Sequence, residues 1–222
     1  MHILITAATE GEWMPSSMQL KQRHPSVDKR IKIQFCTTGV GILSTSVCLT
    51  QLILRQKPDL IIQMGIAGSF NKQIPLGKVL AVKEEILGDI GVEEGGEWKD
   101  IFDLKLEKSS NLPFKKGKLL NPWLIKFNLL KLPMVRSITV NQISTQKKRI
   151  AILQEKYKPI LEGMEGAALH YTCQAMNIPF IQIRSVSNYI GERNKNNWKI
   201  NEAIHQLNQT ILVYIDALYK MN

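Results

Sequence analysis

The sequence contains few cysteines and no long apolar run. Its 3 cysteines, Cys36, Cys48 and Cys173, lie far apart and lack the CxxC spacing of redox and zinc motifs. Because no export signal is evident, we interpret them as reduced, mostly buried thiols. No stretch reaches the roughly 20 apolar residues that a membrane span needs. The N-terminus lacks a basic segment and a cleavage site, so we expect a cytoplasmic protein whose residues 2–8 form a buried strand.

Several catalytic motifs are also absent. No Ser-His-Asp set is evident, and His170 falls in a helical stretch where packing is its expected role. No phosphate-binding P-loop occurs, so neither acyl transfer nor phosphoryl transfer is supported. The turn at 39–41 follows a predicted strand, but Ser44 stands where a dinucleotide fingerprint has its third glycine. The sequence implies no metal and no organic cofactor.

The charge is strongly positive but dispersed. Lysine and arginine number 29 against 19 acidic residues, which gives a net charge of +10. The densest basic cluster, at 147–149, has the pattern of a solvated helix face. We therefore predict no nucleic-acid partner, and the charge favours an anionic small-molecule substrate.

Apolar runs alternate with amphipathic stretches along the chain, which predicts an α/β fold. No repeat, low-complexity tract or linker interrupts this pattern, so we expect one domain over residues 1–222. The stretch 88–117 has many glycines and charges and little periodicity, and we interpret it as a lid or an oligomer contact. The expected strands are 2–8, 31–37, 59–64, 78–84, 135–140 and 180–183, and the expected helices are 42–55, 121–130, 145–157 and 203–220.

Polar and small residues follow several of these strands. In α/β proteins ligands bind at the carboxyl ends of strands, so Glu165, at a predicted helix entrance, and Asn188 should face one cleft. Glu12 follows the first strand, where it either caps a helix or lines that cleft. Two separated carboxylates suit glycosyl chemistry, in which one activates water. Residue types alone leave this as one option among several.

The motifs, taken in order, are similar to those of the nucleoside phosphorylase/nucleosidase superfamily. The matching pieces are the first strand with Glu12, Gly39-Val40-Gly41, Lys57-Pro58-Asp59, Gly65-Ile66-Ala67-Gly68, Met164-Glu165-Gly166-Ala167-Ala168 and Ile183 to Asn188. The resemblance spans nearly the whole chain. It implies a three-layer α/β/α fold with a central mixed twisted sheet. It also implies a homodimer or higher homo-oligomer, in which the partner completes the pocket for the 5′ end of a nucleoside.

The resemblance also implies roles for individual residues. Glu165 would bind the ribose hydroxyls, Met164 would pack against the sugar, and Glu12 would activate the attacking water. Phosphorolytic relatives carry an arginine that holds phosphate at the strand end where Glu12 lies in this sequence. A carboxylate at this place therefore favours hydrolysis. The remaining substrate-binding residues would be Val40, Ile66, Ala67, Gly68, Gln142, Ile143 and Ser187.

Asn188 is the informative departure, because adenine-specific nucleosidases carry aspartate at this position. A carboxamide can donate a hydrogen bond to O6 or N7 of a 6-oxopurine. A site built for one base leaves buried polar groups unpaired with the other base, and this discriminates strongly between 6-oxopurines and adenine. The run 184–193 is similar to the futalosine hydrolase branch, which releases hypoxanthine from futalosine in a menaquinone pathway. Arg193 is either a partner for the carboxylate of that substrate or, as its sequence context favours, a solvated helix residue. The alternatives are a methylthioadenosine/S-adenosylhomocysteine nucleosidase, a purine nucleoside phosphorylase and a non-catalytic nucleoside-binding module.

Overall fold

Strands and helices alternate along the computed structural model, which describes residues 1–23 and 31–221. The strands are β1 (His2–Ala7), β2 (Lys32–Thr37), β3 (Leu60–Ser69), β4 (Val79–Leu87), β5 (Gly91–Glu94), β6 (Glu97–Asp100), β7 (Leu119–Leu120), β8 (Met134–Thr139), β9 (Leu161–Gly163) and β10 (Phe180–Tyr189). The helices are α1 (Glu10–Arg23), α2 (Gly41–Gln56), α3 (Leu124–Phe127), α4 (Lys147–Tyr157), α5 (Gly166–Ala175) and α6 (Ile200–Met221), with a 3₁₀ turn at Lys195–Asn197.

The main sheet is mixed and closes on itself. β1 pairs in parallel with β2 and β3, and β3 pairs in parallel with β10. β10 also pairs antiparallel with β4, which continues through β8 and β9 back to β3. The sheet therefore closes into a ring formed by β3, β10, β4, β8 and β9. Strands β1 and β2 extend the sheet beyond β3, outside this ring. The expectation of a mixed central sheet is confirmed, whereas the closure into a ring had no signal in the sequence.

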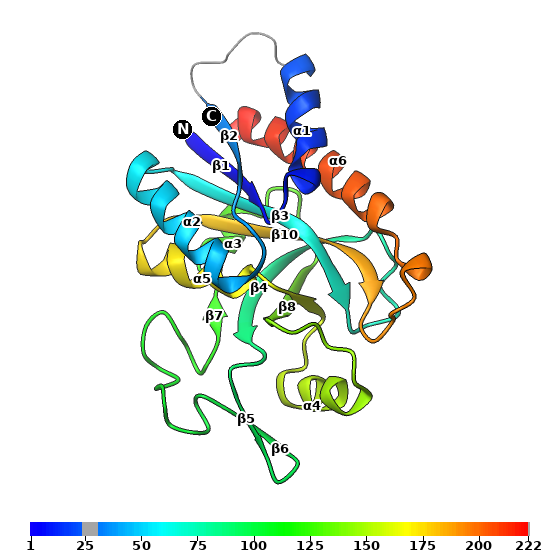
Figure 1. Cartoon of the computed structure of the whole chain (residues 1–222). Coiled ribbons are helices and arrows are strands. Elements are labelled where there is room, and N and C mark those ends of the chain that lie inside the picture. The colour runs from blue at the N-terminus through cyan, green and yellow to red at the C-terminus, as the bar shows by residue number, and fades with distance from the viewer. Residues whose placement is uncertain (24–30, 222) are drawn as a thin grey trace.

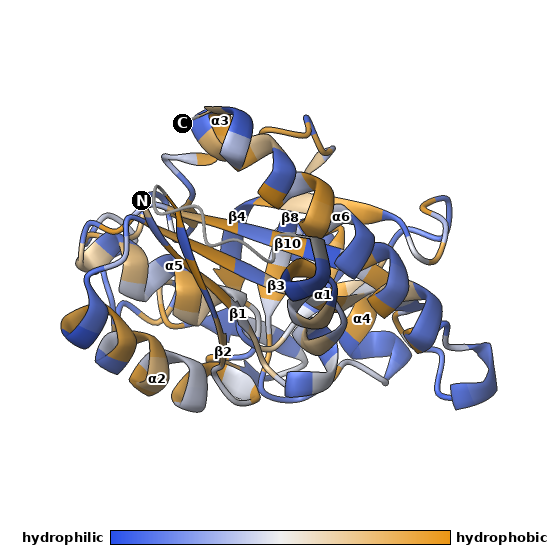
Figure 2. Ribbon diagram, turned by 90° about the horizontal axis from the view of Figure 1, so that it is seen from above, coloured by the Kyte–Doolittle hydropathy of each residue, from blue (hydrophilic) through white to orange (hydrophobic). Residues whose placement is uncertain are grey.

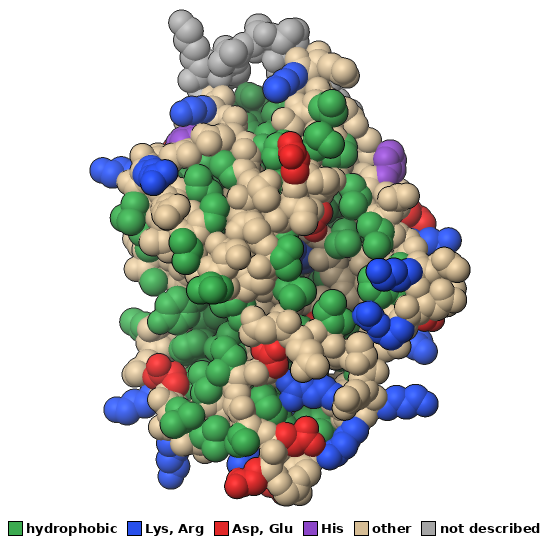
Figure 3. Space-filling model, viewed as in Figure 1, with side chains coloured by type: hydrophobic (Ala, Val, Ile, Leu, Met, Phe, Trp, Pro, Cys, Tyr) green, Lys and Arg blue, Asp and Glu red, His purple; other side chains and the backbone are tan. Residues whose placement is uncertain are grey.

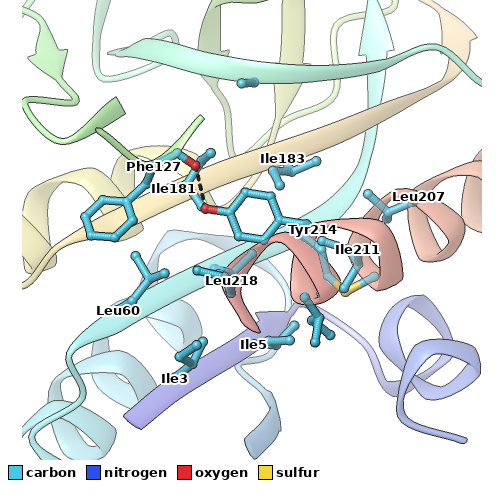
Figure 4. Close-up of a cluster of buried hydrophobic side chains, with 14 of the residues drawn as sticks. Ile3, Ile5, Leu60, Phe127, Ile181, Ile183, Leu207, Ile211, Tyr214 and Leu218 are labelled. Carbon is cyan, nitrogen blue, oxygen red and sulfur yellow. Dashed lines mark hydrogen bonds between the residues drawn. The ribbon is translucent and has the colours of Figure 1, made fainter. Parts of the chain in front are cut away.

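Helices cover both faces of the sheet, as Figures 1 and 2 show: α1 and α6 lie on one side and α2 and α5 on the other. The alternation of side chains along β1 explains this arrangement. Ile3 and Ile5 pack in the cluster that contains α6, whereas Leu4 packs in the cluster that contains α2 and α5. Figure 4 shows the first cluster, in which the buried Tyr214 hydroxyl donates a hydrogen bond to the carbonyl of Phe127.

The ends of several elements differ from the sequence prediction. β3 and β10 continue through the segments expected to be polar tips, because the two strands pair with each other as far as Ser69 and Tyr189. The expected helix at 121–130 is only the single turn of α3. The stretch 88–117 contains a hairpin, β5–β6, followed by irregular turns. The helix end predicted at Lys57 and Pro58 is confirmed, since Lys57 is left-handed with φ 46°. Among the described helices, none has the length and apolarity to span a bilayer.

Candidate active site

A cavity of about 340 Å³ opens where β3, β9 and β10 meet the starts of α1, α2 and α5. Its wall contains ten of the residues predicted for the site, namely Glu12, Val40, Ile66, Ala67, Gly68, Ile143, Met164, Glu165, Ser187 and Asn188. Gln142 lies outside it and lines a neighbouring polar hollow instead. The cavity therefore gathers side chains from segments that lie far apart in the sequence.

Glu12 lies in the first turn of α1 and is 7% exposed. Its Oε2 accepts hydrogen bonds from the N–H of Thr9 at 3.0 Å and from the Thr9 hydroxyl at 3.1 Å. Its Oε1 accepts one from the N–H of Ile66 at 3.1 Å. The carboxylate thus caps its own helix and also lines the cavity. The two roles that the sequence left open coexist in one side chain.

Glu165 immediately precedes α5 and is 6% exposed. Its Oε1 accepts a hydrogen bond from the N–H of Gly41 at 3.1 Å. Gly41 is the first residue of α2, and such first-turn amides have no partner within their own helix. The carboxylate therefore lies at the positive end of α2, which stabilises its charge.

Arg184 is a fully buried cation behind this carboxylate. Its Nη2 lies 3.5 Å from Oε2 of Glu165 and donates to Oε1 of Gln63 at 2.8 Å. Gly65 makes room for it, because a Cβ there would lie 1.9 Å from Nη1 of Arg184 and 3.2 Å from Oε1 of Glu12. One glycine thus allows the guanidinium and both carboxylates to converge. The sequence motif included Arg184, but its contact with Glu165 was not predicted.

Asn188 lies opposite Gly68 at a register shift between β10 and β3. Val186 pairs with Ala67 and Asn188 pairs with Gly68, so Ser187 is an extra residue on β10. The Ser187 hydroxyl donates to Oδ1 of Asn188 at 2.8 Å. This contact orients the amide, whose Nδ2 donates a hydrogen bond to the carbonyl of Tyr189 at 3.3 Å. An added Cβ at Gly68 would lie 3.4 Å from that Nδ2, so Gly68 keeps space open beside the amide.

A network of buried polar groups holds the first turn of α5 against the sheet. Glu85 is fully buried and accepts hydrogen bonds from Gln182 at 2.8 Å and from the Thr139 hydroxyl at 2.9 Å. The same Thr139 oxygen accepts from the N–H of Ala167 at 2.8 Å. Burial raises the pKa of the Glu85 carboxyl, and burial lowers the pKa of nearby His170 to about 4. His170 is therefore a packed, neutral side chain, as the sequence suggested.

The structure also locates the cysteines and Arg193. Of the cysteines, only Cys173 is buried, whereas Cys36 and Cys48 are partly exposed, so the prediction of mostly buried thiols was wrong for two of three. Arg193 places its guanidinium 5.6 Å from the ring centre of Trp198, and Trp198 lines the cavity. Within residues 1–23 and 31–221, no three His, Cys, Asp or Glu side chains gather as metal ligands do.

The cavity at the mixed sheet is lined by the carboxylates of Glu12, Glu162 and Glu165 and by the carboxamide of Asn188, a set that suits an α/β enzyme of the N-glycosidic nucleosidase class. Residues 24–211 match the phosphorylase superfamily, and the chain belongs to that family.

Individual relatives are distant in sequence but similar in fold. The chain is 24% identical over 188 residues to futalosine hydrolase from Thermus thermophilus, covering 80% of this chain and 78% of that protein. It is also 24% identical over 162 residues to 5′-methylthioadenosine/S-adenosylhomocysteine nucleosidase from Bacillus pumilus, covering 70% and 67%. The corresponding nucleosidase from Colwellia psychrerythraea, solved with adenine, superposes with a TM-score of 0.77 at 18% identity, covering 98% and 96%. The likeness to this last structure establishes the fold.

Proposed function

We propose that the protein hydrolyses the N-glycosidic bond of a 6-oxopurine nucleoside, with futalosine as substrate and hypoxanthine as the released base. The observation that carries this proposal is the composition of one cavity, in which the carboxylates of Glu12 and Glu165 accompany the carboxamide of Asn188. Similarity to futalosine hydrolase over 78% of that protein's length supports the choice of substrate.

Cleavage of the bond places positive charge on the ribose ring and negative charge on the purine. Glu165 would bind the ribose hydroxyls, with Met164 packed against the sugar. Because Gly41 and Arg184 hold its carboxylate in place, its negative charge is preorganised beside the developing cation.

Glu12 would accept a proton from the water that attacks C1′. Three donors fix its two oxygens, so the carboxylate enters the reaction already oriented. The negative charge of Glu12 disfavours a phosphate ion at the same place, which supports hydrolysis over phosphorolysis.

Asn188 would recognise the base. The Ser187 hydroxyl donates to the amide oxygen, and one N–H of the amide donates to the carbonyl of Tyr189, so the second N–H is left to donate to O6 or N7 of a 6-oxopurine. An amide supplies no proton, so the proton of the departing base would come from water or from another group.

A second copy of the chain would complete the site. The exposed apolar side chains Val40, Leu43, Val47 and Leu54 follow one stripe of α2 and its entrance, and Val40 also lines the cavity. Figure 3 shows hydrophobic side chains gathered on the side where α2 lies, whereas lysines and arginines are spread around the rim of this face. A partner that covers this stripe would also wall the open side of the cavity. Light scattering on a column should give a dimer or larger species, and Leu43→Glu with Val47→Glu should give a monomer.

Chromatography of products tests the activity directly. The protein is incubated with futalosine, inosine or methylthioadenosine, each with and without phosphate. We expect hypoxanthine from futalosine at a rate that phosphate does not change. A strict requirement for phosphate contradicts hydrolysis, and faster release of adenine from methylthioadenosine contradicts the base assignment in favour of the activity of the Bacillus pumilus relative.

A further inference from the structure

The loop 141–144 joins β8 to α4 and reaches the cavity through Ile143. The strand register places this loop at the end of the cavity that contains Asn188. Gly68 of β3 pairs with Asn188 on one side and with Glu162 of β9 on the other. Paired residues of neighbouring strands project to the same face, so the amide and the Glu162 carboxyl flank the space above Gly68. Glu162 in turn contacts the loop.

Two carboxylates hold the amides of this loop. Oδ2 of Asp89 accepts hydrogen bonds from the N–H of Asn141 at 2.5 Å and of Gln142 at 3.0 Å. Oε1 of Glu162 accepts one from the N–H of Ser144 at 3.0 Å. In the part of the chain that the structure describes, the N–H of Ile143 has no such partner. The loop is thus held on either side of the one residue that enters the cavity.

Asp89 is itself rigidly placed. The preceding Gly88 donates its N–H to the carbonyl of Thr139 at 2.8 Å, and its carbonyl accepts from Nη2 of Arg149 at 2.8 Å. The Arg149 guanidinium in turn lies 4.2 Å from the ring centre of Trp98 in the hairpin. These contacts connect the hairpin, α4 and the loop. Contacts within the protein therefore fix the backbone next to Asp89.

Glu162 is an unusual residue for a structural anchor. It is 5% exposed and lies in a three-residue strand. Burial raises the pKa of its carboxyl, and the Asp89 carboxylate raises that pKa further, while Arg149 opposes the shift. Burying a carboxyl is costly unless hydrogen bonds compensate. In the described residues, only Oε1 has a partner, and that partner is the loop.

We propose that Asp89 and Glu162 are positioning residues that fix the loop 141–144 so that Ile143 and its free N–H face the purine base. The inference rests on the proposed function, because it takes the occupant of the cavity to be a purine nucleoside. In this arrangement neither residue would touch the sugar or the attacking water. Their loss should therefore impair recognition of the purine and spare the chemistry at C1′.

The test compares leaving groups on a common sugar. Futalosine and inosine both carry hypoxanthine, and 4-nitrophenyl β-D-ribofuranoside has the unmodified ribose of inosine with a leaving group that is not a purine and departs without protonation. Asp89→Ala and Glu162→Ala should each lower kcat/KM for futalosine and for inosine by roughly 10-fold or more, mainly through KM, because each removes hydrogen bonds to a charged acceptor. Turnover of the nitrophenyl riboside should stay close to wild type. Asp89→Asn and Glu162→Gln keep an acceptor oxygen and should recover most of the loss.

Binding of hypoxanthine, measured by titration calorimetry, separates this inference from the proposed substrate. The alanine variants should bind the base roughly 10-fold or more weakly than wild type, and Glu155→Ala, which removes an exposed carboxylate from α4, should bind it normally. If wild type cleaves no futalosine but the variants still lose hypoxanthine affinity, the substrate is wrong and the inference stands. Equal affinity in all variants, or an equal fall in turnover of the hypoxanthine nucleosides and of the nitrophenyl riboside, overturns the inference.

Discussion

Gly65→Ala tests whether the convergence of Arg184, Glu12 and Glu165 depends on a missing side chain. The added Cβ would lie 1.9 Å from Nη1 of Arg184, about half of a normal van der Waals separation. Arg184 cannot move into solvent, because it is only 1% exposed. The guanidinium must leave either Gln63 or Glu165, or the pairing of β3 with β10 must open.

The cost follows from two contributions. Overpacking a filled interior costs about 1–3 kcal/mol, and loss of the hydrogen bond from Arg184 to Gln63, which involves a charged donor, costs about 1.5–3 kcal/mol. Together they predict a fall of about 2.5–6 kcal/mol in the free energy of unfolding. In a protein of this size that corresponds to roughly 5–24 °C in Tm.

Urea denaturation followed by tryptophan fluorescence measures the loss in the free energy of unfolding. Hypoxanthine release, at a temperature where the variant is folded, measures the turnover of the active site. Turnover should drop with stability, because displaced Arg184 no longer holds Glu165. Gly11→Ala is the matched control, since a Cβ there has nothing within 4 Å. Gly11 lies within α1, so alanine should stabilise the protein by about 0.4–1 kcal/mol. A Gly65→Ala protein as stable and active as wild type would refute the argument.

Three further predictions concern single side chains. Glu12→Gln should lower kcat by roughly 10²–10⁴-fold, as expected for loss of a general base, with KM nearly unchanged; unchanged turnover would remove Glu12 from that role. Asn188→Asp should abolish cleavage of 6-oxopurine nucleosides and introduce some release of adenine, and a neutral outcome in a substrate panel contradicts the role of Asn188. The pKa of His170, about 4 when folded, lies below the value of about 6.5 in the unfolded chain. As pH falls from about 6.5 to 4 only the unfolded state binds this proton, so unfolding free energy should decrease by about 3 kcal/mol, and His170→Gln should flatten that part of the pH profile of the urea midpoint.

The regular elements were largely predictable because their periodicity is strong. The terminal helix places apolar residues at helical spacing, and β1 is apolar and β-branched, so both were found close to their observed limits. The ends of β3 and β10 were missed because small and polar residues such as Gly68 and Ser187 normally indicate loops. Here both residues lie in strands and line the cavity. The pairing of β3 with β10 outweighs the local preference of these residues for loops.

The charged residues inside the fold were the harder part of the site. Arg184, Glu85 and Glu162 are all at least nine-tenths buried, and a composition-based reading treats charges as surface groups. A signal existed for Arg184, which interrupts an apolar strand, whereas Glu85 follows two other charged residues and Glu162 lies in a strand of three residues. What the sequence could not supply was the partner, because Glu165, Thr139 and Ser144 come from other elements. The motif resemblance found most of the groups that face the cavity, but it missed Glu162 in the cavity wall and Glu85 beneath it.

The extra residue in β10 has a consequence for how base preference can change. Ser187 is the residue without a partner on β3, so a strand that lacked it would still pair Val186 with Ala67 and Asn188 with Gly68. It would lose the hydroxyl that donates to Oδ1 of Asn188 and the extra local twist that a bulge gives to a strand. The register therefore decides which side chain meets the base, whereas the extra residue beside Asn188 decides how its amide is oriented. Deleting Ser187 should weaken the preference for the base while the same amide stays opposite Gly68.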